Sequence, residues 1–299
     1  MIELVATLVS KREAKALTES LLAKLAPIVP QPVRVVQLER HIAADLIFPS
    51  EEGASVGLIE AGLRQALGNE PVDVIIQPSL RRQKRLLIAD MDSTMIEQEC
   101  IDELADFAGF RGQVSEITER AMRGELSFEP ALRERVRLLK GLDVEIVSRV
   151  ITERITQTPG GRTLVMTMRA KGAYTALVSG GFTVFTEPLS LSIGFNEHRS
   201  NTLEIEAGLL TGEVRPPILG REAKRNALIE LRDLFSLAPI DTLALGDGAN
   251  DLDMIQEAGL GVAWQAKPAV AEAAHARLHH SDLTALLYAQ GYPRRTWVE

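Results

Sequence analysis

Two short apolar stretches of this chain lead directly into aspartates. The run LLIA precedes Asp90 and Asp92, and the run LAL leads through a glycine to Asp247, with Asp251 four residues further on. Such runs are typical of buried parallel strands, and ligands of open α/β sheets gather where these strands end. Two carboxylates about 4 Å apart repel by roughly 4 kcal/mol, so the cluster becomes stable when a divalent cation lies among its oxygens. We predict Mg²⁺ as this cofactor, because it prefers carboxylate, water and phosphate oxygens.

The residue types and their spacing suit phosphoryl transfer. An aspartate at a strand end, Asp90, can attack phosphorus and form an aspartyl-phosphate. Asp92 projects to the same side of an extended chain and can act as general acid and then as general base. The remaining need is to neutralise the phosphoryl oxygens. Ser179, the glycine amides that begin at Gly180, and Lys224 can supply this together with the metal ion.

Each of these motifs has an ordinary structural explanation when it is taken alone. A lone D-x-D occurs in surface turns and helix caps, and the glycines after Ser179 could form only a tight turn. Lys224 could be an exposed helix lysine, and Lys171 and Arg221 compete with it as the phosphate-binding cation. The combination of two acidic strand ends with an anion-binding turn between them favours the catalytic interpretation.

Other reactive side chains lack partners in the sequence. His275 and His279 are four residues apart but have no third metal ligand, so we expect structural or exposed histidines. Cys100, the only cysteine, has no evident base beside it, which favours a packing role.

The elements that must position these residues alternate between strand and helix from Leu86 onward. This alternation predicts a Rossmann-like parallel sheet with helices on both faces. Residues 95–157 are expected to be almost wholly helical, which is too long for a simple connection and indicates an inserted helical cap over the strand ends. Other expected elements are core strands at 86–89, 174–178, 243–245 and 260–264, helices at 162–170 and 221–234, and a hairpin over 195–214.

The first 80 residues have a different pattern. Strands at 2–9, 33–39, 43–48 and 72–77, with helices at 11–25 and 51–67, give the order βαββαβ of a ferredoxin-like α+β unit. The basic run 81–85 is predicted to be a solvated connector. We therefore expect two domains, 1–80 and 81–299, with the cap at about 95–158 of the second.

Composition restricts the partners. The chain has 299 residues, 45% of them hydrophobic, and a net charge of −8, which argues against a nucleic-acid partner. One cysteine suits a reducing cytoplasm, the first residues do not resemble a signal peptide, and no apolar window is long enough for a membrane span. The expectation is a cytoplasmic protein that binds a small molecule and no membrane.

Four segments in order resemble the motifs of the haloacid-dehalogenase-like hydrolases. They are DMDST from Asp90, SGGF from Ser179, Lys224, and GDGAND from Gly246. The segment AMRGELSFE followed by LRERV is similar to the cap signature of the phosphoserine phosphatase branch, and the resemblance covers about residues 84–290. The N-terminal unit is similar in topology to ACT-type regulatory domains, which implies dimerisation and an amino-acid effector.

The resemblance implies roles for individual residues. Asp90 would be the nucleophile and Asp92 the general acid and base, while Mg²⁺ would be held by the Asp90 carboxylate, the Asp92 carbonyl and Asp247, with Asp251 in support. Ser179, Gly180, Lys224 and Asn250 would surround the phosphoryl group, Glu99 would bind the substrate ammonium, Arg135 its carboxylate, and Phe128 and Met122 would close an apolar wall. A planar guanidinium matches a carboxylate in this way.

The activity implied by this resemblance is Mg²⁺-dependent hydrolysis of O-phospho-L-serine, the last step of serine synthesis. A related phosphatase or phosphotransferase that acts on another phosphorylated amino acid, such as phosphohomoserine, is the alternative within the enzyme class. An amino-acid-sensing module with a relic hydrolase half is the alternative outside it. Occupation of every required motif position by the required residue type disfavours the relic.

Overall fold

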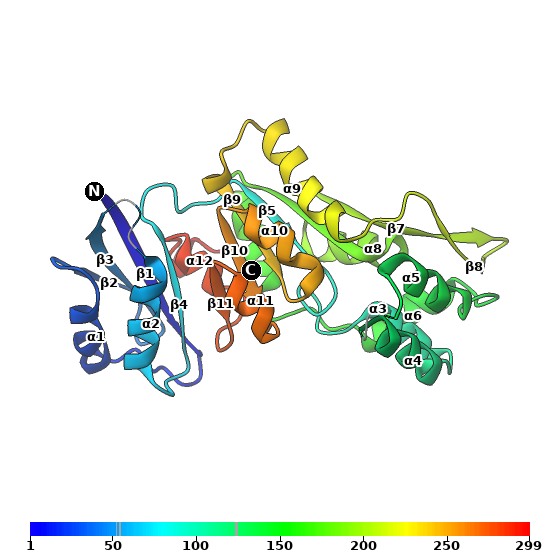
Figure 1. Ribbon diagram of the computed structural model, residues 1–299, viewed down its shortest axis with the longest axis horizontal. Helices are drawn as coiled ribbons and strands as arrows, with labels where there is room; N and C mark the ends of the chain where they lie inside the picture. The colour runs from blue at the N-terminus through cyan, green and yellow to red at the C-terminus, as the bar shows by residue number, and fades with distance from the viewer. Residues whose placement is uncertain (52, 54, 123–124) are drawn as a thin grey trace.

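The computed structural model describes residues 1–51, 53, 55–122 and 125–299, with the backbone alone at 121 and 122. Three parts follow one another along the long axis of the molecule (Figure 1). A small sheet formed by the N-terminal residues lies at one end, a larger sheet lies in the middle, and a group of helices lies at the other end.

A seven-stranded sheet forms the centre of the molecule. Its order is β11-β10-β9-β5-β6-β7-β8, and all neighbours run parallel except β7 and β8. The predicted parallel α/β core is therefore confirmed, with an antiparallel hairpin at one edge. The strands are β5 (Leu86–Ala89), β6 (Tyr174–Phe182), β7 (Glu197–Glu206), β8 (Leu209–Arg215), β9 (Thr242–Gly246), β10 (Leu260–Trp264) and β11 (Ala276–Leu278).

Successive residues of β5 pack into different cores, because side chains alternate across a strand. Leu86 and Ile88 contact the core beneath α9 and α10, whereas Leu87 and Ala89 contact the core beneath α7, α8 and α12. Helices on both faces are thus confirmed. Their bounds are α7 (Gly161–Ala170), α8 (Thr183–Ile193), α9 (Arg221–Leu234), α10 (Leu252–Glu257), α11 (Pro268–Ala273) and α12 (Ala285–Ala289).

The inserted segment after β5 is helical, as the sequence predicts. It contains α3 (Cys100–Phe107), α4 (Arg111–Met122), α5 (Phe128–Arg137) and α6 (Glu145–Arg154). The β7–β8 hairpin reaches this cap, since Gly141 N and Val144 N donate to Leu210 O and Gly208 O at 2.8 and 2.9 Å. Core and cap are therefore connected by backbone hydrogen bonds as well as by the chain.

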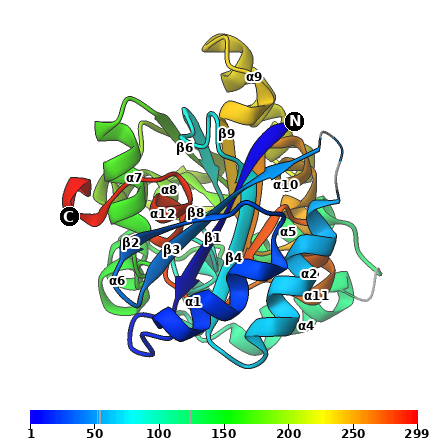
Figure 2. The same ribbon diagram turned by 90° about the vertical axis from the view of Figure 1, so that its left-hand side faces the viewer.

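The N-terminal sheet is antiparallel and has the order β2-β3-β1-β4, which is compatible with the predicted ferredoxin-like unit. Two helices cover the face formed by Leu4, Leu8 and Val74 (Figure 2). The elements are β1 (Ile2–Ser10), α1 (Glu19–Leu25), β2 (Arg34–Glu39), β3 (Ala43–Ser50), α2 (Val56–Leu67) and β4 (Val72–Pro78).

Both predicted N-terminal helices start later than expected. Lys15 has a φ of 48°, and the Thr18 side chain accepts the N–H of Leu21, so α1 begins only at Glu19 and not at 11. Helix α2 begins at Val56 rather than 51. The apolar pattern alone gave no sign of the turn before α1.

The basic run 81–85 is only partly the solvated connector that was predicted, since Arg81, Gln83 and Arg85 are exposed but Lys84 is buried. Arg81 pairs with the buried Asp241, and Arg82 Nη1 lies 2.7 Å from Oδ2 of the buried Asp45. Lys84 is 2% exposed and its Nζ donates to Ile240 O at 2.9 Å. Burial lowers the pKa of Lys84 to about 8. This segment joins the two sheets tightly.

The second face of the N-terminal sheet is also buried. Val9 and Ile75 share a core with Leu283 and Tyr288 near the C-terminus.

Strand β11 and helices α8, α10, α11 and α12 were not predicted from the sequence. Among the described residues, no helix is both long and apolar enough to cross a membrane.

Candidate active site

A cavity of about 160 Å³ lies between the ends of the core strands and the cap. The core residues that line it come from three segments, which are the residues directly after β5, the last residues of β6 and the loop after β9. The cavity is lined by Asp90, Asp92, Glu99, Ile101, Phe128, Leu132, Arg135, Ser179, Gly180, Gly181, Phe182, Asp247 and Asn250. Three of the four separated motifs therefore meet here, and Lys224, the fourth, contacts Asp90 from behind the lining.

Asp90 lies at the floor of the cavity and is 5% exposed. Lys224 Nζ lies 2.7 Å from Asp90 Oδ1 and 2.7 Å from Asp251 Oδ1. Burial and the charge of Asp251 raise the pKa of Asp90 well above its ordinary value, although Lys224 acts against this rise. Burial alone would lower the pKa of Lys224, but Asp90 and Asp251 raise it above its ordinary value, so the lysine is a permanent cation here.

Asp251 is held entirely by the protein. Its Oδ1 faces Lys224, and its Oδ2 accepts the N–H groups of Asp247 and Gly248 at 3.2 and 3.0 Å. A Cβ at Gly246 would lie 2.4 Å from Asp251 Cγ, so a side chain there would displace this carboxylate. Asp251 thus fixes the loop that carries Asp247.

Asp92 lies beside Asp90 at the start of the cap. Its Oδ1 accepts the N–H of Cys100 at 2.9 Å, and Ser179 Oγ lies 3.4 Å from its Oδ2. Burial and the charge of Glu99 raise the pKa of Asp92 to about 7. Cys100 therefore packs at the site and also orients this carboxylate through its backbone.

Ser179 ends the regular part of β6 and forms a turn with the glycines that follow it. Its Oγ accepts the N–H of Gly181 at 2.9 Å. Gly180 lies under the Phe128 ring, since a Cβ there would be 3.5 Å from Cζ of that ring. This turn presents a hydroxyl and a compact backbone to the cavity.

The carboxylate oxygens fit a hard cation. Ligand atoms of Asp90, Asp247 and Asp251 all lie within 4.8 Å of one another. Thr94 Oγ1 donates to Asp247 Oδ1 at 2.8 Å, and burial raises the pKa of Asp247 to about 6. Because Asp251 is already occupied by Lys224 and two N–H groups, Asp90 and Asp247 are the carboxylates best placed to bind Mg²⁺.

Opposite charges lie at the cap end of the cavity. Glu99 precedes α3 and accepts Ser93 Oγ at 2.7 Å. Arg135 on α5 makes no ion pair within the described ranges, and its Nε donates only to Ala131 O at 3.3 Å. Burial lowers the pKa of Arg135, while Asp102 and Glu99 act to raise it. A buried guanidinium with free donors is suited to bind a carboxylate.

The structure brings together nearly all of the predicted site residues. Asn250 and Phe128 line the cavity, Phe128 being 43% exposed, whereas the side chain of Met122 lies outside the described residues. Competing cations lie elsewhere, since Lys171 faces the Tyr292 ring and Arg221 pairs with Asp253. Gly181, one of the glycines whose amides were predicted to face the phosphoryl group, also lines the cavity, and the residues missed from the sequence are Thr94, Ile101, Leu132 and Phe182.

Thr94 belongs to a motif that had been identified, so it could have been included. Phe182 also belongs to such a motif, at the end of β6, whereas Ile101 and Leu132 are apolar cap residues, and only the folded cap shows which of its apolar residues turn toward the site.

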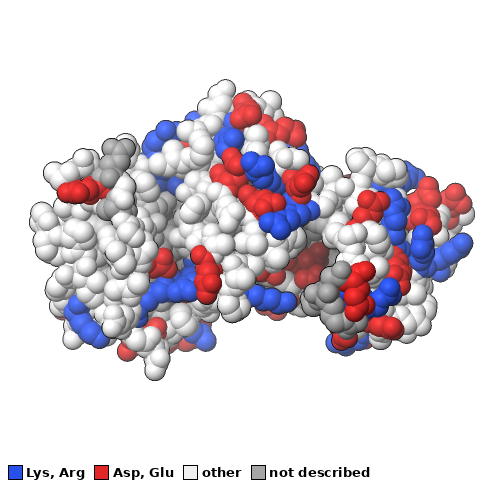
Figure 3. Space-filling view, in the orientation of Figure 1, with Lys and Arg blue, Asp and Glu red and all other residues white. Residues whose placement is uncertain are grey.

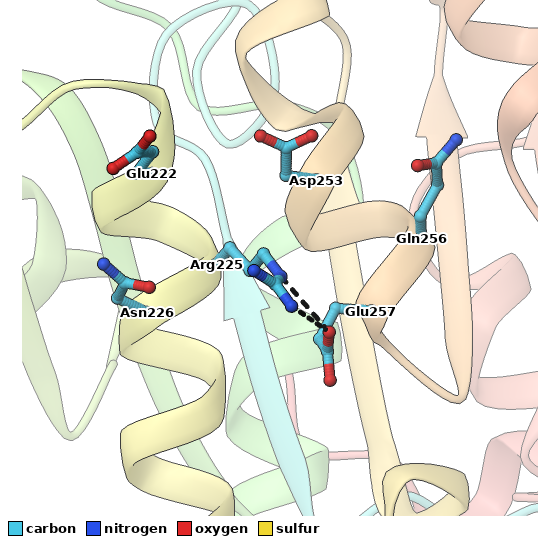
Figure 4. Close-up of a pocket in the computed structure, with 6 residues that line it drawn as sticks. All are labelled: Glu222, Arg225, Asn226, Asp253, Gln256 and Glu257. Atoms are coloured by element: carbon cyan, nitrogen blue, oxygen red, sulfur yellow. Dashed lines mark hydrogen bonds and ion pairs between the residues drawn. The ribbon is translucent and has the colours of Figure 1, made fainter.

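A second hollow between α9 and α10 does not share these features. Figure 4 shows Arg225 paired with Glu257, and the two atoms of this ion pair, Nη2 and Oε2, lie 3.0 Å apart. Charges of both signs alternate over these helices (Figure 3), and Arg221 and Arg232 also have acidic partners. Arg225, Asp253 and Glu257 in this hollow are thus neutralised by ion pairs, in contrast to the carboxylates of the catalytic cavity.

Comparison with known proteins gives the family. Residues 87–256 match the model of the haloacid dehalogenase-like hydrolases, so the chain belongs to that family. The phosphoserine phosphatase of Archaeoglobus fulgidus is 43% identical over 226 residues, which are 75% of this chain and 65% of that relative. The chain thus spans slightly less than two thirds of the length of that relative.

Two crystal structures match nearly the whole chain. A HAD family hydrolase from Salmonella enterica serovar Typhi has a TM-score of 0.85 and 30% identity, over 96% of this chain and 98% of that one. A probable phosphoserine phosphatase from Vibrio cholerae has a TM-score of 0.76 and 32% identity, over 98% of this chain and 88% of that one. The N-terminal sheet is therefore included in both matches.

Proposed function

We propose that this chain is a Mg²⁺-dependent phosphatase that hydrolyses O-phospho-L-serine to L-serine and phosphate. The observation that carries the proposal is the composition of the cavity of about 160 Å³. The cavity holds Asp90, Asp92 and Ser179, which suit a phosphoryl group, and also Glu99 and Arg135, which suit an amino acid. Phosphoserine carries both groups, and similarity to phosphoserine phosphatases supports the choice.

Recognition of the amino-acid end uses opposite charges. The Arg135 guanidinium, without an ion-pair partner in the described part of the chain, would bind the substrate carboxylate, and Glu99 would bind the ammonium. The apolar side chains of Ile101, Leu132 and Phe128 would exclude water around the short carbon skeleton.

The first chemical step would transfer the phosphoryl group to the protein. A carboxylate oxygen of Asp90 attacks phosphorus, and the bond from phosphorus to the serine oxygen breaks. Asp92, which carries a proton near neutral pH when its pKa is about 7, donates that proton to the leaving alkoxide. Lys224, 2.7 Å from Asp90 Oδ1, offsets negative charge on the phosphoryl oxygens, and Ser179 would donate to them.

The second step would reverse the role of Asp92. As a carboxylate, it takes a proton from water, and the resulting hydroxide attacks the aspartyl-phosphate. The bond between phosphorus and Asp90 breaks, so phosphate leaves and the Asp90 carboxylate is restored.

The oxygens of Asp90 and Asp247 and the backbone carbonyl of Asp92 would hold the metal ion. When bound, Mg²⁺ supplies positive charge that offsets the carboxylates and polarises a phosphoryl oxygen. The raised pKa values of Asp90 and Asp247 support this, because they report buried negative charge without enough compensation.

A substrate panel tests the proposal. With Mg²⁺ present, kcat/KM should be highest for O-phospho-L-serine, lower for phosphothreonine and lowest for phosphohomoserine, because the cavity is small. A preference for phosphohomoserine, or transfer of the phosphoryl group to an added alcohol in place of water, would support the alternative enzyme class instead.

A further inference from the structure

A much larger cleft of about 1030 Å³ opens beside the catalytic cavity, and we call it the side cleft. It lies between the start of the cap and the loops after β9 and β10. Glu99, Asp247 and Asn250 line both spaces. The other residues of the side cleft are Ser93, Glu97, Thr158, Pro159, Gly248, Ala249, Trp264, Gln265, Lys267, Ala269 and Val270.

The two ends of an amino-acid substrate face different surroundings in this arrangement. Glu99 belongs to both spaces, and Ser93, which donates to its Oε1 at 2.7 Å, lines the side cleft and not the catalytic cavity. Arg135 lines only the catalytic cavity, where Ile101 and Leu132 accompany it. The ammonium of the substrate would therefore face open space, whereas its carboxylate would face packed side chains.

From this asymmetry we propose that the substrates include peptides and N-acyl derivatives whose C-terminal residue is phosphoserine. The inference rests on the function proposed above and extends it to a wider substrate class. A group attached to the nitrogen would enter the side cleft, whereas a group attached to the carboxylate would collide with the wall beside Arg135.

The side cleft suits the additional residue of such a peptide. One residue extends a chain by about 3.5 Å, which moves the free ammonium outward from Glu99. Glu97 is exposed, lines the side cleft and makes no ion pair with the described part of the chain, so its carboxylate can accept this ammonium. The exposed Pro159 and Ala269 provide most of the apolar surface for a side chain, and the edge of Trp264, which is 7% exposed, adds a little.

The chemistry is unchanged for the longer substrate. The bond from phosphorus to the serine oxygen breaks, the phosphoryl group passes to Asp90 and then to water, and Asp92 returns the proton to the alcohol. The products are phosphate and the peptide with a C-terminal serine, and the peptide bond stays intact.

The first experiment compares three substrates on the full chain with Mg²⁺. They are O-phospho-L-serine, glycyl-O-phospho-L-serine and O-phospho-L-seryl-glycine. We expect kcat/KM for the glycyl compound within about 30-fold of phosphoserine, since one charge-assisted hydrogen bond is weakened. We expect kcat/KM for seryl-glycine at least about 100-fold below the glycyl compound, because Arg135 loses its carboxylate.

The second experiment fills the side cleft. Ala269 is exposed and lines it, so Ala269→Trp should lower kcat/KM for the glycyl compound about tenfold or more and leave that for phosphoserine within about twofold. Ala14→Trp, which adds the same ring at an exposed position in the N-terminal unit, is the matched control and should change neither.

Three results would overturn the inference. They are turnover of phosphoserine with none of the glycyl compound, equal turnover of the two dipeptides, and an equal loss for both good substrates in Ala269→Trp. Failure to hydrolyse phosphoserine itself would instead refute the proposed function and this inference with it.

Discussion

Two groups of buried aspartates in this molecule differ in how well the protein neutralises them. At the junction of the two sheets, Asp73 accepts the N–H groups of His279, His280 and Ser281, and Asp45 accepts Thr7 Oγ1 and pairs with Arg82. In the catalytic cavity, Asp90, Asp92 and Asp247 crowd around a single buried lysine, and burial raises the pKa of each.

This difference separates structural carboxylates from functional ones. The junction carboxylates have their hydrogen bonds satisfied within the chain, so they stabilise the contact between the two sheets. The cavity carboxylates have too little positive charge near them, which a divalent cation would supply, and groups with such raised pKa values cluster at functional sites. The comparison predicts that mutations of the cavity carboxylates will lower activity and spare stability. Mutations of the junction carboxylates should lower stability and spare activity.

Asp90→Asn should have the largest effect. Loss of the nucleophile should lower kcat for phosphoserine by roughly 10⁴-fold or more, while the free energy of unfolding changes by no more than about 1 kcal/mol. Kinetic assays and denaturant unfolding check this, with mass spectrometry to exclude deamidation. Asp253→Asn, at a 31% exposed side chain on α10 that pairs with Arg221, is the control, and retained turnover in Asp90→Asn would mean that the nucleophile is misassigned.

Asp73→Ala should show the reverse. Three backbone N–H groups lose their acceptor, so the free energy of unfolding should fall by about 3 kcal/mol while kcat stays within about twofold. Urea denaturation measures the loss, with Asp233→Ala, at a 71% exposed side chain, as the control. A stable Asp73→Ala protein would remove the distinction between the two groups.

Arg135→Ala should change selectivity more than general activity. We expect kcat/KM for phosphoserine to fall about 100-fold and that for phosphoethanolamine, which has no carboxylate, to fall less than about fivefold. Arg133→Ala is a close control, because Arg133 pairs with Glu129 on the same helix. Equal losses on both substrates would exclude Arg135 from carboxylate recognition.

Lys84 makes the free energy of unfolding depend on pH, and the direction of this dependence follows from its lowered pKa. Burial lowers its pKa from the ordinary 10.5 to about 8, so the unfolded chain binds more protons between these values and stability rises with pH. From pH 7 to 9.5 the wild type should gain about 2 kcal/mol relative to Lys84→Met. Unfolding curves at several pH values test this, with Lys11→Met as the control. A parallel pH profile for wild type and Lys84→Met would contradict it.

The parts of the fold with strong local patterns were predictable. Strand β5 and helix α9 match their predicted ranges, because a short apolar run and a 3.6-residue apolar period are local signals. Asp90, Asp247 and Lys224 could be brought together because parallel strands end at one edge and motif order fixes the rest. The proposed roles of these residues, and of the first 80 residues in dimerisation or effector binding, stay predictions.

The features that escaped prediction depend on tertiary contacts. The run 81–85 has the composition of an exposed linker, and the ion pairs of Arg81 and Arg82 depend on Asp241 and Asp45, which are remote in sequence. The turn before α1 depends on Lys15 adopting a positive φ, and a lysine in the sequence gives no indication of such a backbone conformation. The side cleft exists only once the cap has folded against the loops after β9 and β10.

The central claim is that the cavity carboxylates require a divalent cation in order to hydrolyse a phosphorylated amino acid. Phosphate release from O-phospho-L-serine by the purified protein, before and after chelation with EDTA and again after Mg²⁺ is restored, tests it most directly. We predict release that disappears on chelation and returns with Mg²⁺. Undiminished release in EDTA, or none under any of these conditions, would contradict the account.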